Sequence, residues 1–122
     1  MTAPTVITFI GYSRLLSLND RLHWAQKATL NRMWRKAAHG AAVMAQTPVH
    51  GRSLVNVSLP VRNVNQRRDA HNFIATVKPI IDGLVDAGVW PDDNGRYVVT
   101  DEPCFHARHL DPFVTITITE LP

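Results

Sequence analysis

Hydrophobic and polar side chains alternate in the stretch Leu54-Val55-Asn56-Val57-Ser58-Leu59-Pro60-Val61-Arg62, and this alternation decides the fold class. Successive side chains of a strand point to opposite faces, so every second residue shares a face. One face then carries Val55, Val57, Leu59 and Val61. The stretch therefore predicts a strand with one buried face, and Pro60 places that strand at a sheet edge or near its own end.

The rest of the chain divides into segments of similar kind. We predict further strands over residues 6–10, 97–100 and 113–120, and helices over about 20–46 and 76–87. Gly88 follows the second helix as its expected C-terminal stop. The order β-α-β-α-β-β predicts one α/β (α+β) domain over residues 1–122, with a mixed sheet of about four strands packed by two main helices.

The first predicted helix has one apolar side and one basic side. Helical spacing places Leu30, Trp34, Ala37, Ala41 and Met44 on the buried side, and Arg32, Arg35 and Lys36 on the opposite side. Ser17 and Asn19 are candidate caps.

We expect Trp34 in the core. Trp24 and Trp90 fit either packing or stacking on unpaired bases, and we favour packing. His106 and His109 are expected at the surface.

Composition limits the class of protein. The chain has 122 residues, 45% of them hydrophobic, which suits one globular domain. It contains no apolar run of the ~20 residues that a membrane span needs. Its first residues lack the features of a signal peptide, and the lone Cys104 excludes an internal disulfide and a cysteine-based zinc site. We expect a soluble, cytoplasmic protein without membrane contact or organic cofactor.

Charge is divided unevenly along the chain. Residues 1–68 hold ten Lys/Arg and one acid, a net charge of +9, whereas residues 69–122 hold three Lys/Arg and nine acids, a net charge of −6. A basic half suits a polyanionic partner, because each phosphate contact releases counterions. A solvated surface without a partner would also accommodate such charges.

Two acidic motifs are the candidates for chemistry. Asp69 follows Arg67 and Arg68 directly, and Asp92-Asp93 returns after the second predicted helix within a turn-forming stretch. Carboxylates brought together by folding hold a hard divalent cation, and neighbouring guanidinium groups receive a phosphodiester. The pattern predicts metal-assisted cleavage of nucleic acid. A plain tight turn would also explain Asp92-Asp93-Asn94-Gly95.

Five motifs together resemble a known family. They are Asn19-Asp20-Arg21, Arg68-Asp69-Ala70-His71-Asn72, Lys78-Pro79-Ile80-Ile81-Asp82-Gly83-Leu84, Ala87-Gly88-Val89-Trp90-Pro91-Asp92-Asp93 and the closing residues 114–120. In this order and spacing the chain resembles the RusA family of Holliday junction resolvases (crossover junction endodeoxyribonucleases), found largely in phages and prophages.

The resemblance implies a homodimeric, magnesium-dependent nuclease that nicks four-way DNA junctions symmetrically, in the host cytoplasm if phage-encoded. It implies Asp69 and Asp93 as metal ligands, Lys78 as the basic residue near the scissile phosphate, and Asn72 as a supporting polar group. Asp92 is an alternative or additional ligand. The candidate DNA-binding residues are Asn19, Arg21, Arg32, Arg35, Lys36, Arg67 and Arg68.

His71 departs from the family pattern, which has a second acid at that position. An imidazole suits transition metals better than magnesium. His71 is thus a ligand, a general acid or base, or a structural residue. If it is a ligand, Mn²⁺ should support activity at least as well as Mg²⁺. Two other functions stay open: a junction-binding or DNA-binding protein with impaired catalysis, and a small metal-dependent ribonuclease.

Overall fold

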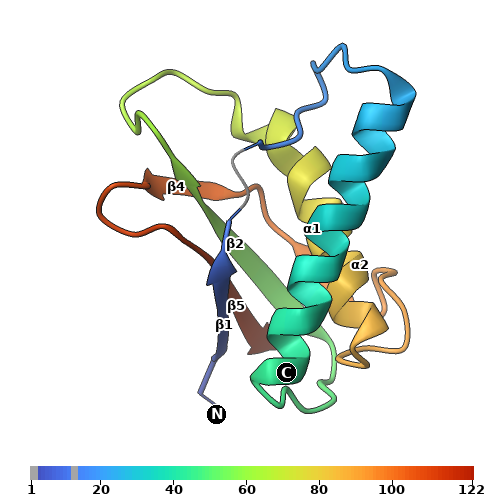
Figure 1. Cartoon of the computed structure of the whole chain (residues 1–122). Helices are drawn as coiled ribbons and strands as arrows, with labels where there is room; N and C mark the ends of the chain where they lie inside the picture. The colour runs from blue at the N-terminus through green and yellow to red at the C-terminus, as the bar shows by residue number, and fades with distance from the viewer. Residues whose placement is uncertain (1–2, 12–13) are drawn as a thin grey trace.

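A computed structural model describes residues 3–11 and 14–122 (Figure 1). In chain order its elements are β1 (Thr5–Ile10), α1 (Trp24–Met44), β2 (Ser53–Val61), the short 3-10 helix η1 (Ala70–Phe73), α2 (Ile74–Asp86), β3 (Val98–Thr100), β4 (Cys104–Ala107) and β5 (Phe113–Glu120). They form one α/β domain with two α-helices and a five-stranded mixed sheet. The predicted fold class is confirmed, with one strand more than expected.

β2 is the central strand of the sheet. It pairs antiparallel with β5 on one side, while on the other side β3 and β4 pair parallel with its first and last parts. β1 pairs with β5 and forms one edge. The edge position predicted for the strand containing Pro60 is therefore wrong. The alternative is confirmed, since Pro60 is the next-to-last residue of β2.

The two helices lie side by side on one face of the sheet (Figure 1). They pack closely because Gly83 of α2 has no side chain: a Cβ there would meet the carbonyl oxygen of Arg35 and lie 2.9 Å from Cβ of Ala38. The core between helices and sheet contains the inward residues of β2 and β5, with Trp34, Ile80 and Leu84 from the helices.

The buried stripe of α1 differs from the prediction. The buried residues are Trp34, Ala38 and Ala42, four residues apart, whereas Met44 is 85% exposed. Because α2 approaches α1 at Gly83, small residues at these spacings face the second helix, and the stripe turns away from the larger Met44. The helix also begins later than predicted, at Trp24, where His23 Nδ1 accepts a hydrogen bond from the backbone N–H of Ala25. Ser17 and Asn19 are thus not its caps.

The structure tests the predictions for three tryptophans and two histidines. Trp34 and Trp90 are buried, as expected. Packing for Trp24 was wrong, since this side chain is 76% exposed at the start of α1. His106 is half-buried and lies 2.6 Å from Ser58 Oγ rather than at the surface, because the unpredicted strand β4 pairs with β2 there. His109 is exposed, as predicted.

Across residues 3–11 and 14–122, no helix combines the length and the apolar character needed to span a bilayer.

Candidate active site

One face of α2 carries charged side chains at helical spacing. Lys78, Asp82 and Asp86 are four residues apart, so they lie along the same side of the helix. Lys78 Nζ donates a hydrogen bond to Asp82 Oδ1 at 2.9 Å. Asp86 instead accepts two hydrogen bonds from Arg35 of α1, at 2.6 and 2.8 Å. The basic end of this face, around Lys78, is the part that meets a third acid.

That acid is Asp93, which the chain brings back to α2 after the helix has ended. Gly88 adopts a φ of 84°, and the N–H of Val89 bonds to the carbonyl of Leu84, which turns the chain out of the helix. Trp90 is buried, and its Nε1 donates to the carbonyl of Gly51 at 3.1 Å. With Trp90 held in the core, the following turn folds back and Asp93 Oδ2 contacts Lys78 Nζ.

The neighbouring Asp92 forms hydrogen bonds within its own turn. One oxygen of its carboxylate accepts the N–H of Asp93 at 2.7 Å and the other accepts the side-chain amide of Asn94 at 3.0 Å. Both oxygens therefore stabilise the turn. Sequence could not distinguish the two acids, but the structure turns Asp93 to Lys78 and turns Asp92 to its own loop.

Lys78 and Asp93 stabilise each other's charged form. A hydrogen bond from Lys78 lowers the pKa of Asp93 below its ordinary value, against a smaller opposing effect of burial. Partial burial acts to lower the pKa of Lys78, but hydrogen bonds to Asp93 and Asp82 outweigh it and raise that pKa. Lys78 is therefore a permanent cation at neutral pH, and its side chain is 61% exposed and reachable from solvent.

A hollow of about 250 Å³ lies beside this pair. Its walls are Ile74, Val77, Lys78, Ile81, Asp93 and Thr100. Apolar side chains of α2 thus surround the two charged groups on one side. Such a setting strengthens electrostatic interactions with a bound group relative to open water.

Asp69 lies at the start of the same helical segment. It is the N-cap of η1: its Oδ1 accepts the N–H of His71 at 3.2 Å, and its backbone carbonyl accepts the N–H of Asn72 at 3.1 Å. The carbonyl of Asn72 in turn accepts the N–H of Leu18. The structure therefore holds the Asp69–Asn72 turn against the segment before α1, in a fixed position ahead of Lys78.

His71 pairs with an acid that sequence analysis did not single out. Its Nδ1 lies 3.8 Å from Glu102 Oε1, and both side chains are about 60% exposed. Among the described residues, no hydrogen bond or ion pair joins Asp69 or His71 to Lys78 or Asp93. The two acidic motifs thus make separate contacts: Asp69 caps η1, and Asp93 bonds to Lys78 of α2.

The oxygen ligands around Lys78 suit only some metals. Within residues 3–11 and 14–122, no three His, Cys, Asp or Glu side chains are grouped closely enough to hold a metal ion. Asp82 and Asp93 nevertheless converge on one cationic atom, Lys78 Nζ. Two carboxylates fit magnesium, which usually keeps several waters and takes one or two carboxylates. They do not fit zinc, which takes three or four protein ligands.

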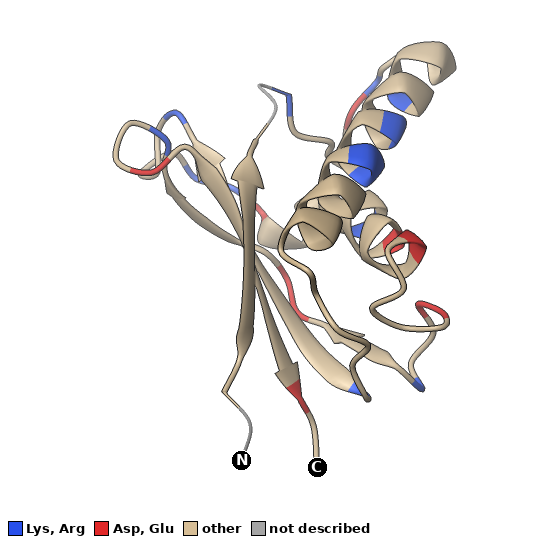
Figure 2. Ribbon diagram, turned by 60° about the horizontal axis from the view of Figure 1, so that its bottom comes forward, with Lys and Arg blue, Asp and Glu red and all other residues tan. Residues whose placement is uncertain are grey.

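The candidate DNA-binding residues lie in two regions. Figure 2 shows basic residues along α1 and in the loops that follow β2 and β4. On α1, Arg35 is bonded to Asp86 and Arg32 to Thr29, while Lys36 is exposed. Arg67 and Arg68 lie in the loop after β2, and exposed Asn19 and Arg21 precede α1. Of these, Arg35 is committed to holding the two helices together.

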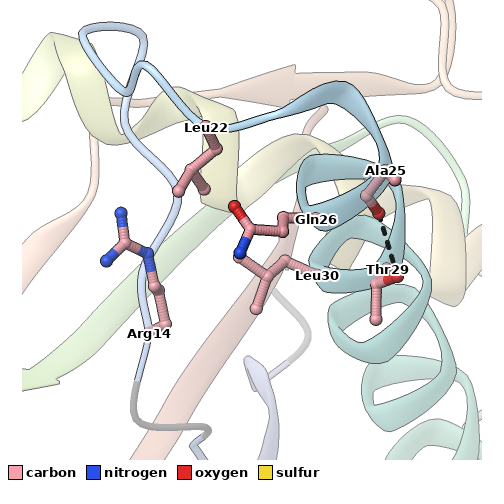
Figure 3. Close-up of a pocket in the computed structure, with 6 residues that line it drawn as sticks. All are labelled: Arg14, Leu22, Ala25, Gln26, Thr29 and Leu30. Atoms are coloured by element: carbon pink, nitrogen blue, oxygen red, sulfur yellow. Dashed lines mark hydrogen bonds between the residues drawn. The ribbon is translucent and has the colours of Figure 1, made fainter.

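A second hollow, of about 460 Å³, lies between α1 and the segment before it (Figure 3). Gln26 and Leu30 of α1 face Leu22 and Arg14 across it. Among the described residues Arg14 is its one charged wall residue, and it lies 3.7 Å from Asp20. Without a carboxylate among its walls, this hollow offers nothing to hold a metal ion.

Four charged residues with functional contacts were missed by sequence analysis: Asp82 and Glu102 beside the acidic motifs, and Arg62 and Arg108 beyond the end of β2. Asp82 could have been found, because Lys78 and Asp82 have the four-residue spacing of a helical ion pair. Glu102 and Arg108 gave no signal, since their positions depend on strand pairing.

Compared with known proteins, the chain matches no protein-family model and no curated protein. Its resemblance to the RusA family therefore stays a prediction.

Proposed function

We propose that the protein is a metal-dependent endodeoxyribonuclease that resolves four-way DNA junctions by symmetric phosphodiester hydrolysis, acting as a homodimer. The observation that carries this proposal is the convergence of Asp82 and Asp93 on Lys78. Carboxylates from two separate segments meet one cation there, next to a hollow with apolar walls. Such an arrangement suits binding of a divalent cation beside a phosphate group.

The protein's own residues have complementary roles in this proposal. Asp82 and Asp93 would hold the magnesium ion, and Asp69 has one carboxylate oxygen, Oδ2, with no bonded partner among the described residues. A bound magnesium ion supplies a water of lowered pKa and offsets phosphoryl charge. Lys78 would release one carboxylate and donate to a phosphate oxygen, where its fixed positive charge stabilises the charge that develops in the transition state.

A two-fold dimer suits this substrate. Resolution of a junction requires cuts in two symmetry-related strands, and a homodimer presents two equal sites at a fixed separation. Contacts to the backbone rather than to bases would position the junction, so binding should weaken steeply with added salt.

Two features favour a second candidate, a junction-binding or DNA-binding protein without efficient catalysis. Among the described residues, two carboxylates contact Lys78 and no group of three metal-ligating side chains forms. In addition, His71 stands where the family has an acid. A gel shift without magnesium followed by a cleavage assay with magnesium separates the candidates. Binding without cutting would establish the second, whereas cutting by the wild type and binding without cutting by Asp93→Asn would establish the first.

A ribonuclease would use the same carboxylates. Labelled junction DNA and labelled RNA offered together to the protein in magnesium distinguish the two substrates. The proposal expects cleavage of the junction, and preferential loss of the RNA would overturn it.

A further inference from the structure

A separate pocket lined by arginines lies beyond the end of β2. Its volume is about 420 Å³, and its walls are Leu15, Pro60, Val61, Arg62, Arg68, Phe73 and Arg108. Arg62, Arg68 and Arg108 are called the arginine pocket below. Two of the three, Arg62 and Arg108, were not among the DNA-binding residues predicted from sequence.

Pairing of two strands brings Arg62 and Arg108 together. β4 runs parallel to β2 with Val61 opposite Ala107, and the N–H of Arg108 bonds to the carbonyl of Val61 at 2.8 Å. Arg62 follows Val61 at the end of β2, and Arg108 follows Ala107 at the end of β4. They leave the sheet side by side although forty-six positions of chain separate them, which explains why the sequence did not reveal the pocket.

Arg68 is held in place on the third side. Its Nη1 donates to the carbonyls of Asn63 and Gln66 at 2.8 and 3.2 Å, and its guanidinium carbon lies 5.5 Å from the ring centre of Phe105. Phe105 is itself packed edge-on against Phe73, at 5.3 Å between ring centres. These contacts fix the guanidinium group and leave its Nε and Nη2 without a bonded acceptor in the described part of the chain.

The three positive charges have no counter-charge bonded to them. In residues 3–11 and 14–122, no ion pair involves Arg62, Arg68 or Arg108. The nearby Asp111 uses its carboxylate to accept the N–H of Phe113 at 2.9 Å. Guanidinium groups gathered around a hollow repel one another unless an anion joins them, and their planar donors match phosphate oxygens.

We propose that the arginine pocket binds one backbone phosphate of the DNA strand. The identity of the polymer rests on the proposed function, but the pocket itself is distinct from the Lys78 site. Arg68 is the neighbour of Asp69 in the chain, so a phosphate held here lies on the strand that approaches the Asp69 turn. The pocket thereby fixes the position of the DNA strand and does not contribute to the chemical step.

Charge-removing variants test this proposal. Arg62→Gln and Arg108→Gln are each compared with Arg52→Gln, which removes the same charge from the residue directly before the other end of β2. Nine strand residues, about 30 Å, separate the two ends. Affinity for a junction is measured without divalent metal over a range of salt concentrations, and thermal unfolding verifies that each variant is folded.

We expect each pocket variant to bind about tenfold more weakly and to lower the salt slope by about one, while Arg52→Gln stays within about twofold of wild type. Arg108→Lys, which keeps the charge, should recover most of the slope. Pocket variants that bind as tightly as Arg52→Gln would overturn the proposal. Inorganic phosphate is also added as a competitor at constant ionic strength. Phosphate that binds the pocket without displacing DNA would overturn the proposal too.

The same experiment separates the pocket from the enzyme activity. A wild type that never cuts DNA, but whose salt-dependent binding falls in both pocket variants, refutes the nuclease and supports the pocket. A wild type that cuts junctions, while both pocket variants bind DNA as tightly as the wild type, supports the nuclease and refutes the pocket.

Discussion

Lys78 is bonded to Asp93, although fifteen positions of chain and the end of a helix separate them. The contact depends on Trp90, whose burial directs the turn back toward α2. Asp82 reaches the same lysine from one helical turn away. A cation between two carboxylates is thus built into the fold of residues 78–93.

The two adjacent acids should differ in effect. Asp93→Asn removes a carboxylate from the Lys78 site, so junction cleavage should fall about 100-fold or more. Asp92→Asn changes only hydrogen bonds within the turn and should keep most of the activity, with a loss of stability of about 1 kcal/mol. Single-turnover cleavage and urea unfolding of both variants measure this. Equal loss of cleavage would show that Asp92 is a ligand too.

Lys78 should compete with a bound metal for its carboxylates. In Lys78→Gln, Asp82 and Asp93 lose their internal cation, so Mn²⁺, used as a spectroscopic probe, should bind more tightly than in wild type. Cleavage should nevertheless become slower, because the charge that stabilises the transition state is gone. Electron paramagnetic resonance titration reports the affinity. Weaker Mn²⁺ binding in this variant would argue against a metal between these carboxylates.

The ion pair between the helices should depend on pH. A hydrogen bond from Arg35 lowers the pKa of Asp86 below its ordinary value of 3.8, so the pair's contribution is fully present above that pH and is lost as the pH falls through the lowered pKa. Because both side chains are partly exposed, the coupling should be only about 0.5–1 kcal/mol at neutral pH. A double-mutant cycle of Arg35→Gln and Asp86→Asn, measured by urea unfolding at pH 7 and at a pH below the lowered pKa of Asp86, checks it. Coupling that persists unchanged in acid would contradict the assignment.

Two glycines of the helices should respond in opposite directions. A Cβ at Gly83 would collide with the backbone of α1, so Gly83→Ala should lower the free energy of unfolding by about 1–3 kcal/mol. Gly40 has nothing within 4 Å of a Cβ, so Gly40→Ala should raise it by about 0.5–1 kcal/mol. Denaturant unfolding of both variants tests the closeness of the helix packing. A neutral Gly83→Ala would show that the helices are not in contact there.

Local pattern was sufficient to predict most of the fold. β2 and β5 were found because apolar side chains recur at every second residue over most of each strand, and α2 because its apolar positions repeat with a helical period. β4 was missed, since four residues, Cys104–Ala107, are too few to show alternation and become a strand only by pairing with the end of β2. The exposure of Met44 was missed because the direction of α1 depends on where α2 approaches it.

The candidate site was predictable in its residue types and less so in its arrangement. Asp93 and Lys78 were both selected from sequence, and folding brings them into contact. The role of Asp92 in its turn, the pairing of His71 with Glu102 and the meeting of Arg62 with Arg108 all depend on tertiary contacts. No spacing along the chain encodes those contacts directly.

The central claim is that this protein cuts branched DNA with magnesium at acids on α2 and in the turn that follows it, Asp82 and Asp93. The most direct measurement follows both strands of a labelled four-way junction during a magnesium titration, with wild type and with Asp93→Asn. We predict paired nicks at symmetry-related positions for the wild type, none without divalent metal, and binding without cutting for the variant. A wild type that leaves the junction intact at every magnesium concentration, or a variant that cuts at the wild-type rate, would contradict the account.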